Sequence, residues 1–255
     1  MAESDWEDED AAAYDGASRM SFLEHLEELR KRIVYSLYAL LVGCGISFFF
    51  AVDLTHYLQR YLTSQGGKLI YTELMGGFMF YFKVGGVCGL LLALPVIFWQ
   101  FWMFVSPGLY QKEKRIAIPF VVFSSLLFGS GVAFAHKVAI PSMLAFFNKF
   151  ESEYIAMMPN ASEAFDFYLK VVLAFGVVFQ MPILVFFLAR FGIVTARWMW
   201  KNFRYAVLII FILAAVATPS ADPVNQTIFA APMIILYLIS IGVAWVFQKK
   251  KKDDD

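Results

Sequence analysis

Long apolar runs, separated by short polar segments, recur along most of the chain. A run of about 20 apolar residues is long enough to cross the hydrocarbon core of a bilayer as an α-helix. The pattern predicts six such helices, at about residues 33–52, 78–104, 119–135, 167–188, 205–217 and 224–247. We therefore expect an all-α fold: a polytopic membrane protein whose six transmembrane helices form one domain over residues 21–248.

The fifth predicted span is shorter than the others. As a helix, residues 205–217 would rise about 20 Å, whereas the hydrocarbon core is about 30 Å thick. The sixth span opens with two amides, Asn225 and Gln226, and could be shortened as well. Such a final hairpin must thin the bilayer or lie behind longer helices. The alternative is a fifth helix that begins near Trp198 and lets Arg204 reach back to the interface.

Both ends of the chain are charged. Residues 1–20 hold seven carboxylates and few apolar side chains, so we expect a disordered acidic tail in the cytoplasm. Residues 249–255, KKKKDDD, form a second charged tail. No cleavable signal is expected, because the chain does not open with a basic region followed by an apolar stretch.

Composition and charge placement support a membrane protein and indicate its orientation. Hydrophobic residues make up 60% of the chain and charged residues 16%, against about 45–50% and about 25% in soluble domains. Of the 21 Lys and Arg residues, 15 flank the side of the membrane that would hold the N-terminus, and four lie in loops on the other side. Because cytoplasmic loops are rich in Lys and Arg, we expect a multi-pass protein of the cytoplasmic (inner) membrane with both termini in the cytoplasm.

The sequence shows no pattern typical of a metal site, a cofactor site or an enzyme. His25, His56 and His136 fall at predicted membrane edges or in loops, and Cys44 and Cys88 fall inside apolar runs as small packing residues. Zinc-ligand spacing, a phosphate-binding glycine loop and a nucleophile motif are missing from the sequence. We expect no catalytic activity, no cofactor and no nucleic-acid partner.

A secondary transporter or channel for a small solute is the alternative function. Such proteins usually show paired halves and ionisable groups at mid-membrane depth. This chain shows no internal repeat, and no Asp or Glu lies within a predicted span. Lys83 and Lys170 lie near span ends, where Lys83 can extend its amine to the interface.

The segment before the first span, residues 22–33 (FLEHLEELRKRI), combines an apolar helix face with carboxylates and three closing cations. The cations are expected of a cytoplasmic anchor. The carboxylates of Glu27 and Glu28 add nothing to such an anchor, so they could receive a basic ligand. The alternative is that each pairs with a neighbouring Lys or Arg, and that the segment is only a topology signal.

Four motifs carry a resemblance to a known family. They are HLEELRKRI before the first span, FVSPGLYQKEKR after the second, FGVVFQMPI in the fourth, and TPSADPVNQTIFAAPM across the last turn. In this order, on six spans, they resemble the TatC family of twin-arginine protein translocases over about residues 21–248. The resemblance implies a concave, cupped arrangement of six helices with a short final hairpin.

The same resemblance implies a function and partners. TatC proteins are core translocase subunits that bind the twin-arginine signal peptides of folded passenger proteins and nucleate the site of their export across the cytoplasmic membrane, driven by the proton-motive force. The implied partners are those signal peptides, the TatA and TatB subunits, membrane lipids and further copies of the chain in the receptor complex.

The resemblance also assigns functional positions. The residues implied to bind the signal peptide are Glu28, Arg30, Phe104, Pro107 and Glu113. Gln180 falls on an intramembrane polar position that faces partners and is often glutamate in the family, and Asp222 falls in the last external turn. An amide keeps hydrogen bonding but cannot titrate, so a mechanism that needs proton exchange at Gln180 is not expected here. The alternative for Gln180 is a packing residue beside a kink at Pro182.

The chemistry of Glu28 and Glu113 agrees with recognition of paired arginines. A carboxylate can accept two parallel hydrogen bonds from one planar guanidinium, which is permanently charged. The two glutamates come from segments distant in sequence but on the same predicted face of the membrane. Both carboxylates are surrounded by cations, which face anionic lipid headgroups.

Overall fold

The computed structural model describes residues 22–64, 68–105, 117–150, 158–218 and 222–248. Within these ranges the chain is helical, apart from short connections and one isolated parallel bridge between Ile70 and Asn160. The elements are α2 (Phe22–Phe49), α3 (Ala51–Thr63), α4 (Gly76–Val105), α5 (Ala117–Phe134), the π-helical turn η3 (Ala135–Ala139), α6 (Ile140–Phe147), the 3₁₀ turn η4 (Asn148–Phe150), α7 (Ala161–Val178), α8 (Met181–Arg190), α9 (Ala196–Lys201), α10 (Phe203–Ala217) and α11 (Pro223–Phe247).

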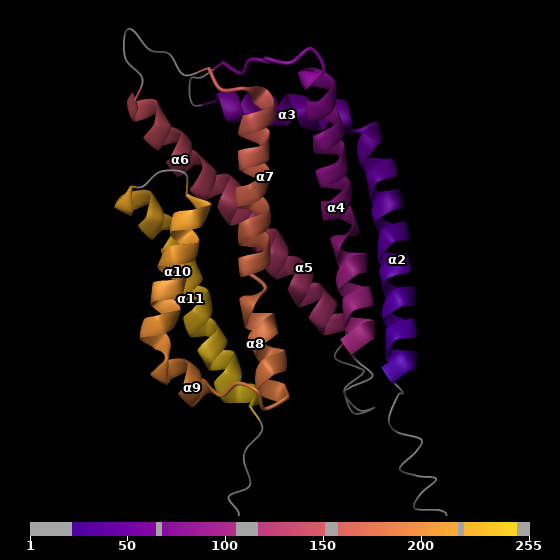
Figure 1. Cartoon of the computed structure of the whole chain (residues 1–255), viewed down its shortest axis with the longest axis vertical. Helices are drawn as coiled ribbons and strands as arrows, with labels where there is room; N and C mark the ends of the chain where they lie inside the picture. Colours follow the sequence, from indigo (N-terminus) through magenta and orange to yellow (C-terminus); the bar gives the residue numbers. More distant parts are fainter. Residues whose placement is uncertain (1–21, 65–67, 106–116, 151–157, 219–221, 249–255) are drawn as a thin grey trace, which may run out of the picture.

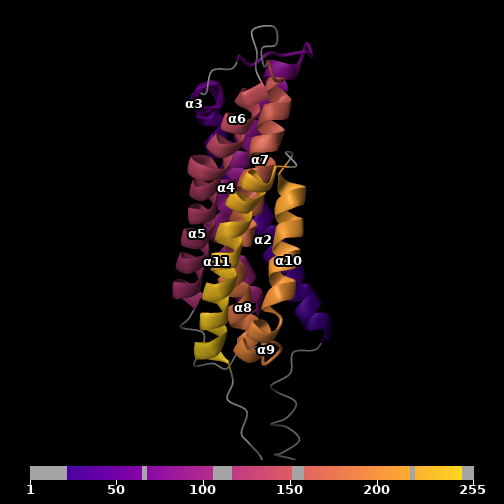
Figure 2. The same ribbon diagram turned by 90° about the vertical axis from the view of Figure 1, so that its left-hand side faces the viewer.

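The bundle has two different ends (Figure 1). The terminal end is where α2 begins and α11 ends, and it also holds the last turn of α4 and the short helix α9. The opposite end, called the α3 end, holds α3, which lies across the bundle, and the beginning of α7. Figure 2, turned by 90°, again shows α3 at one end and α9 at the other.

The described residues include five helical stretches that are long and apolar enough to cross a membrane. They are Glu24–Phe49, Gly76–Phe104, Ile118–Phe150, Ala161–Arg190 and Pro223–Phe247. Together with the shorter apolar helix α10, they account for the six predicted spans and confirm the all-α polytopic class. Since α11 has 25 residues and therefore rises about 37 Å, the shortening of the final hairpin is confined to α10.

The third and fourth spans are longer than predicted. The third continues past residue 135 through η3 into α6, so His136 lies within a helical turn rather than in a loop. Pro141 is tolerated because it sits in the first turn of α6. The fourth begins at Ala161 because Asn160 caps α7: its side chain accepts a hydrogen bond from the backbone N–H of Ser162.

The fifth span begins close to its predicted start. α10 starts at Phe203, and Trp198 belongs to the separate helix α9, whose N-cap is Thr195. The two helices break at Asn202, where the backbone leaves helical geometry (φ −97°, ψ 13°). The alternative of one long helix from Trp198 is therefore not what forms.

Glycine allows α2 and α4 to lie side by side at short distance (Figure 1). A Cβ added to Gly89 of α4 would lie 2.5 Å from the Cα of Cys44 in α2. A Cβ added to Gly43 of α2 would lie 2.5 Å from the carbonyl oxygen of Gly89. Backbones approach this closely only where side chains are very small. This contact sets the charged start of α2 against the last turns of α4.

The largest buried cluster joins α5, η3, α6, α7, α10 and α11. Phe175 of α7 is buried there, and its ring lies 5.0 Å from that of Phe134 and 5.1 Å from that of Phe229. Aromatic pairs at this distance add to the burial of their surface. The cluster holds α7 in place and thereby fixes the break between α7 and α8 that carries Gln180.

Candidate functional site

Glu28 lies on the face of α2 that meets α4 and is held there by an ion pair. Its Oε1 accepts a hydrogen bond from Nη2 of Arg32 at 2.9 Å, and the Glu28 and Arg32 side chains are 15% and 23% exposed. Nη1 of Arg32 also donates to Oε1 of Gln100 in α4 at 3.3 Å. The carboxylate is therefore positioned through Arg32 by a residue of the neighbouring helix.

This ion pair leaves hydrogen-bonding capacity unused. Among the described residues, the buried Oε2 of Glu28 and the buried Nε of Arg32 have no hydrogen-bond partner. An ionised carboxylate has about four acceptor sites, and a buried polar atom without a partner is costly. Oε2 of Glu28 therefore keeps unused acceptor capacity, which a further guanidinium could reach only after side chains around this buried atom move aside.

A cavity of about 610 Å³ surrounds this carboxylate at the terminal end. It is lined by Glu24, Glu27, Glu28, Lys31, Arg32 and Tyr35. Glu27 pairs with Lys31 at 3.4 Å, and both side chains are more than 60% exposed, so that pair contributes little. With three carboxylates against two cations, the lining favours a cationic ligand.

Phe104 lies on the α4 side of the same region. Its ring stacks on that of His25, with centroids 4.5 Å apart and planes 21° from parallel. His25 was not among the predicted site residues. Its spacing could have identified it, because positions 25, 28 and 32 share one face of a helix.

Arg30 lies on a different face of α2. It is exposed, and two positions from Glu28 place it about 200° around the helix axis. There it lines a smaller cavity of about 330 Å³ together with Glu27, Lys31, Val34, Tyr35 and Tyr38. The cation that contacts Glu28 is Arg32 rather than Arg30. Pro107 and Glu113 lie outside the described residues, in the segment between α4 and α5.

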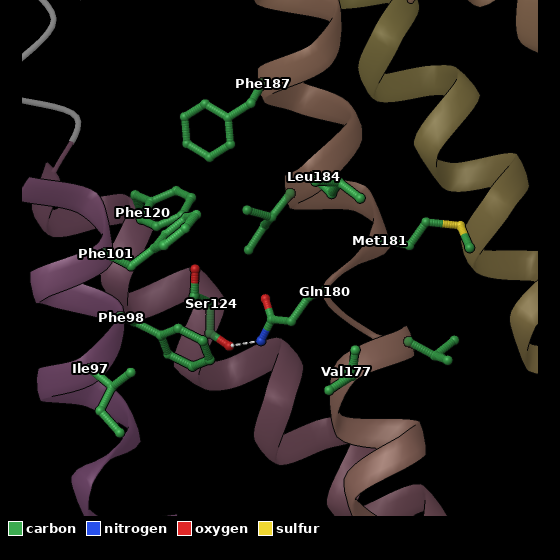
Figure 3. Close-up of a pocket in the computed structure, with 12 residues that line it drawn as sticks. Ile97, Phe98, Phe101, Phe120, Ser124, Val177, Gln180, Met181, Leu184 and Phe187 are labelled. Atoms are coloured by element: carbon green, nitrogen blue, oxygen red, sulfur yellow. Dashed lines mark hydrogen bonds between the residues drawn. The ribbon is translucent and has the colours of Figure 1, made fainter. Parts of the chain in front are cut away.

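Gln180 occupies the break between α7 and α8 (Figure 3). Its side-chain Nε2 donates to the backbone carbonyl oxygen of Ser124 in α5 at 2.8 Å. Pro182 stands in the first turn of α8, where its missing N–H interrupts the ladder of hydrogen bonds. The amide therefore bridges two spans at the point where one of them is interrupted.

An apolar cavity of about 490 Å³ adjoins this amide (Figure 3). Its lining comes from α4, α5, α7 and α8: Ile97, Phe98, Phe101, Phe120, Ser124, Val177, Val178, Gln180, Met181, Ile183, Leu184 and Phe187. The buried hydroxyl of Ser124 has no hydrogen-bond partner among the described residues. An apolar ligand with one polar group could fill this space and pair with the hydroxyl of Ser124 or with the side-chain oxygen of Gln180, which accepts no hydrogen bond from the described residues.

Asp222 has a structural role. Its Oδ2 accepts a hydrogen bond from the backbone N–H of Asn225 at 3.1 Å, which makes it the N-cap of α11. A capping carboxylate typically stabilises a helix by about 1 kcal/mol. Asp222 begins α11, whose other end lies at the terminal end, so the structure does not bring it to Glu28.

An ion pair between α4 and α7 was missed by the sequence analysis. Nζ of Lys83 donates to Oδ1 and Oδ2 of Asp166 at 2.7 and 2.8 Å. The expectation that no carboxylate lies within a span is wrong, because α7 begins earlier than predicted and includes Asp166. Lys83 is paired rather than free to reach the interface. One feature of the sequence could have indicated this pair: Lys83 and Asp166 carry opposite charges and lie at the same end of the second and fourth spans.

Comparisons with known proteins identify the family of the chain. Residues 24–232 match the family described as Sec-independent protein translocase protein (TatC). The chain is 41% identical over 239 residues to a Sec-independent protein translocase protein TatC of Koribacter versatilis, covering 91% of this chain and 88% of that protein. It is 44% identical over 237 residues to the protein of that name from Desulforapulum autotrophicum, covering 92% of this chain and 87% of that one.

A solved structure shows the same fold. A crystal structure of the twin-arginine translocase receptor TatC is 34% identical to this chain and superposes with a TM-score of 0.75, covering 87% of this chain and 98% of the other. A second crystal structure of that receptor, obtained in the detergent DDM, gives a TM-score of 0.77 at 33% identity and covers 87% of this chain and 99% of the other. The chain therefore belongs to the TatC family of Sec-independent protein translocase proteins.

Proposed function

We propose that this translocase subunit is the receptor for twin-arginine signal peptides, and that Glu28 binds one of the two arginines. The observation that carries the proposal is the half-used carboxylate: Oε1 of Glu28 is held by Arg32, while the buried Oε2 has no partner among the described residues. The second arginine would bind Glu113, and the ring of Phe104 with Pro107 would contact the peptide beside them.

Arginine suits this site better than lysine. A guanidinium offers parallel donors in one plane, whereas an ammonium is a compact point charge. Arg32 and Gln100 limit the directions from which a ligand can approach Glu28, because they occupy its α4 side. A signal arginine would therefore add to Arg32 rather than replace it.

The remaining parts of the proposal concern partners and surroundings. The terminal end faces the cytoplasm of a cell with an inner membrane, so both termini lie on the side where folded passengers carry their signals. Export would be driven by the proton-motive force, with TatA, TatB and further copies of this chain as partners. The cavity beside Gln180 is apolar with few polar groups, as needed for contact with a transmembrane helix of such a partner.

Crosslinking tests the receptor proposal directly. Glu24→Cys and Lys31→Cys, both at the cavity around Glu28, should crosslink to a signal peptide that carries a thiol-reactive group beside its arginines. Lys201→Cys is the control, because it lies in α9 at the same end of the bundle but outside this cavity. Equal crosslinking at all three positions, or equal yields with a lysine–lysine signal, would contradict specific recognition at Glu28.

Cysteine labelling tests the orientation. In a chain with Cys44→Ala and Cys88→Ala, Lys68→Cys and Lys149→Cys should react with a membrane-impermeant reagent added to intact cells. Lys112→Cys and Lys201→Cys should react only after the membrane is opened, because the excess of cations marks their side as cytoplasmic. Labelling of both sets in intact cells rules out the proposed topology.

A further inference from the structure

The α3 end carries a second polar cavity, remote from Glu28. α3 packs one face against the bundle through Ala51, Thr55, Leu58 and Leu62, and it lies across the ends of the spans rather than along them (Figure 1). A helix in this position lies at the level of the lipid headgroups. A cavity of about 750 Å³ opens between α3 and residues 68–71.

The charges that line this cavity are all basic. The lining residues are His56, Gln59, Arg60, Thr63, Lys68, Leu69 and Tyr71. Arg60 and Lys68 are exposed and form no ion pair with a carboxylate of the described residues. The hydroxyl of Tyr71 and the second side-chain N–H of Gln59 add neutral donors, whereas the hydroxyl of Thr63 donates to the carbonyl oxygen of Gln59. This set of donors matches a phosphate, which takes several hydrogen bonds and carries a negative charge.

Hydrogen bonds fix the cavity on two sides. Nε2 of Gln59 in α3 donates to the hydroxyl of Tyr71 at 2.9 Å. The backbone N–H of Ile70 donates to the carbonyl of Pro159 at 3.2 Å, and the N–H of Ala161 donates to the carbonyl of Ile70 at 2.9 Å. The segment that carries Lys68 is thus attached both to α3 and to the start of α7. The backbone on both sides of the cavity is thus fixed, so binding has to order only the side chains of Arg60 and Lys68.

Exposed apolar side chains follow the cavity segment in the sequence, just before the α4 span begins. Leu74 is fully exposed and Met75 is 60% exposed, directly after Tyr71 and next to the start of the α4 span. A free phosphate or an acidic polar segment would leave these side chains uncovered, whereas lipid acyl chains would cover them. Basic residues beside exposed apolar side chains, at the level of the headgroups, therefore favour an anionic lipid over a soluble anion.

We propose that the cavity at the α3 end binds the phosphate of an anionic phospholipid, with the charge held by Arg60 and Lys68 and the acyl chains covering Leu74 and Met75. The site is independent of signal recognition at Glu28. It would fix the depth of α3, and through the attached segment the start of α7, relative to the headgroups.

The test is native mass spectrometry of the full-length protein in detergent, titrated with dioleoyl phosphatidylglycerol. The site variant carries Arg60→Gln and Lys68→Gln. The control variant carries Lys137→Gln and Lys149→Gln. These changes remove two exposed cations of the third span, Ile118–Phe150, that do not line the cavity. We expect about tenfold weaker binding of the lipid by the site variant and less than twofold change in the control. Dioleoyl phosphatidylcholine, which has the same chains but no net charge, should bind the unmodified protein about tenfold more weakly.

Three results would overturn the proposal. The first is equal affinity of the site and control variants for phosphatidylglycerol, both having melting temperatures like that of the unmodified protein. The second is equal affinity of the unmodified protein for the two lipids. The third is an effect of the site variant on binding of inorganic phosphate but not of phosphatidylglycerol, which would make the cavity a site for a soluble anion.

Discussion

Replacing Glu28 by alanine is expected to weaken binding of a twin-arginine signal peptide about tenfold. A hydrogen bond to a charged group contributes about 1.5–3 kcal/mol, and about 1.4 kcal/mol corresponds to a factor of ten in affinity. Because the Glu28 side chain is only 15% exposed, solvent screens this contact little. The measurement is peptide affinity in nanodiscs at fixed salt, with a signal that lacks both arginines as the baseline.

Matched variants separate recognition from stability. Glu28→Ala leaves Arg32 half-buried without its carboxylate, so part of its effect could come from loosened packing of α2 on α4. Glu28→Gln still accepts a hydrogen bond from Arg32 but lacks charge, and it should also weaken binding. Glu27→Ala, at an exposed pair on the same helix, should change affinity less than twofold.

The second carboxylate should behave like the first. Glu113→Ala is also expected to cost about tenfold, and a lysine–lysine signal should bind more weakly than an arginine–arginine signal. If neither Glu28→Ala nor Glu113→Ala changes the affinity for the arginine signal, the glutamates serve only to pair with neighbouring cations, and the receptor model is wrong.

Much of the fold could be predicted because hydrophobicity alone determines which segments cross a membrane. The six predicted apolar runs correspond to five long helical stretches and the short helix α10 among the described residues. The errors lie at boundaries where local polarity conflicts with helix continuation. His136, Lys137 and Pro141 looked like a loop, but a π-helical turn and a first-turn proline carry the helix through them. The side chain of Asn160 caps α7, so this helix begins at Ala161 rather than near residue 167 as predicted.

The site was only partly predictable because its contacts join distant segments. Glu28 could be predicted as a site residue because carboxylates are not needed in the cationic segment that anchors the first span. The pairing of Glu28 with Arg32 rather than Arg30 follows from helix geometry, since four residues separate neighbours on one face. The contribution of Gln100 is different, because it depends on how closely Gly43 and Gly89 bring α2 to α4. The pair of Lys83 and Asp166 likewise depends on the relative placement of two helices, which sequence patterns do not specify.

Gln180→Leu is expected to reduce transport about fivefold, whereas Gln180→Glu should retain it. Leucine has a similar size but cannot donate to the carbonyl of Ser124 or offer an acceptor to the cavity, and a neutral hydrogen bond contributes about 0.5–1.5 kcal/mol.

Gln180→Glu keeps the size of the side chain and its acceptor oxygen and, when protonated, can still donate to that carbonyl. Met181→Leu, which alters an apolar residue of the same cavity, is the control and should leave transport unchanged. The measurement is the export rate of a folded reporter in cells that carry each variant at equal membrane abundance. A fully active Gln180→Leu would show that the amide only packs beside Pro182, and that its hydrogen bond to Ser124 of α5 has no part in translocation.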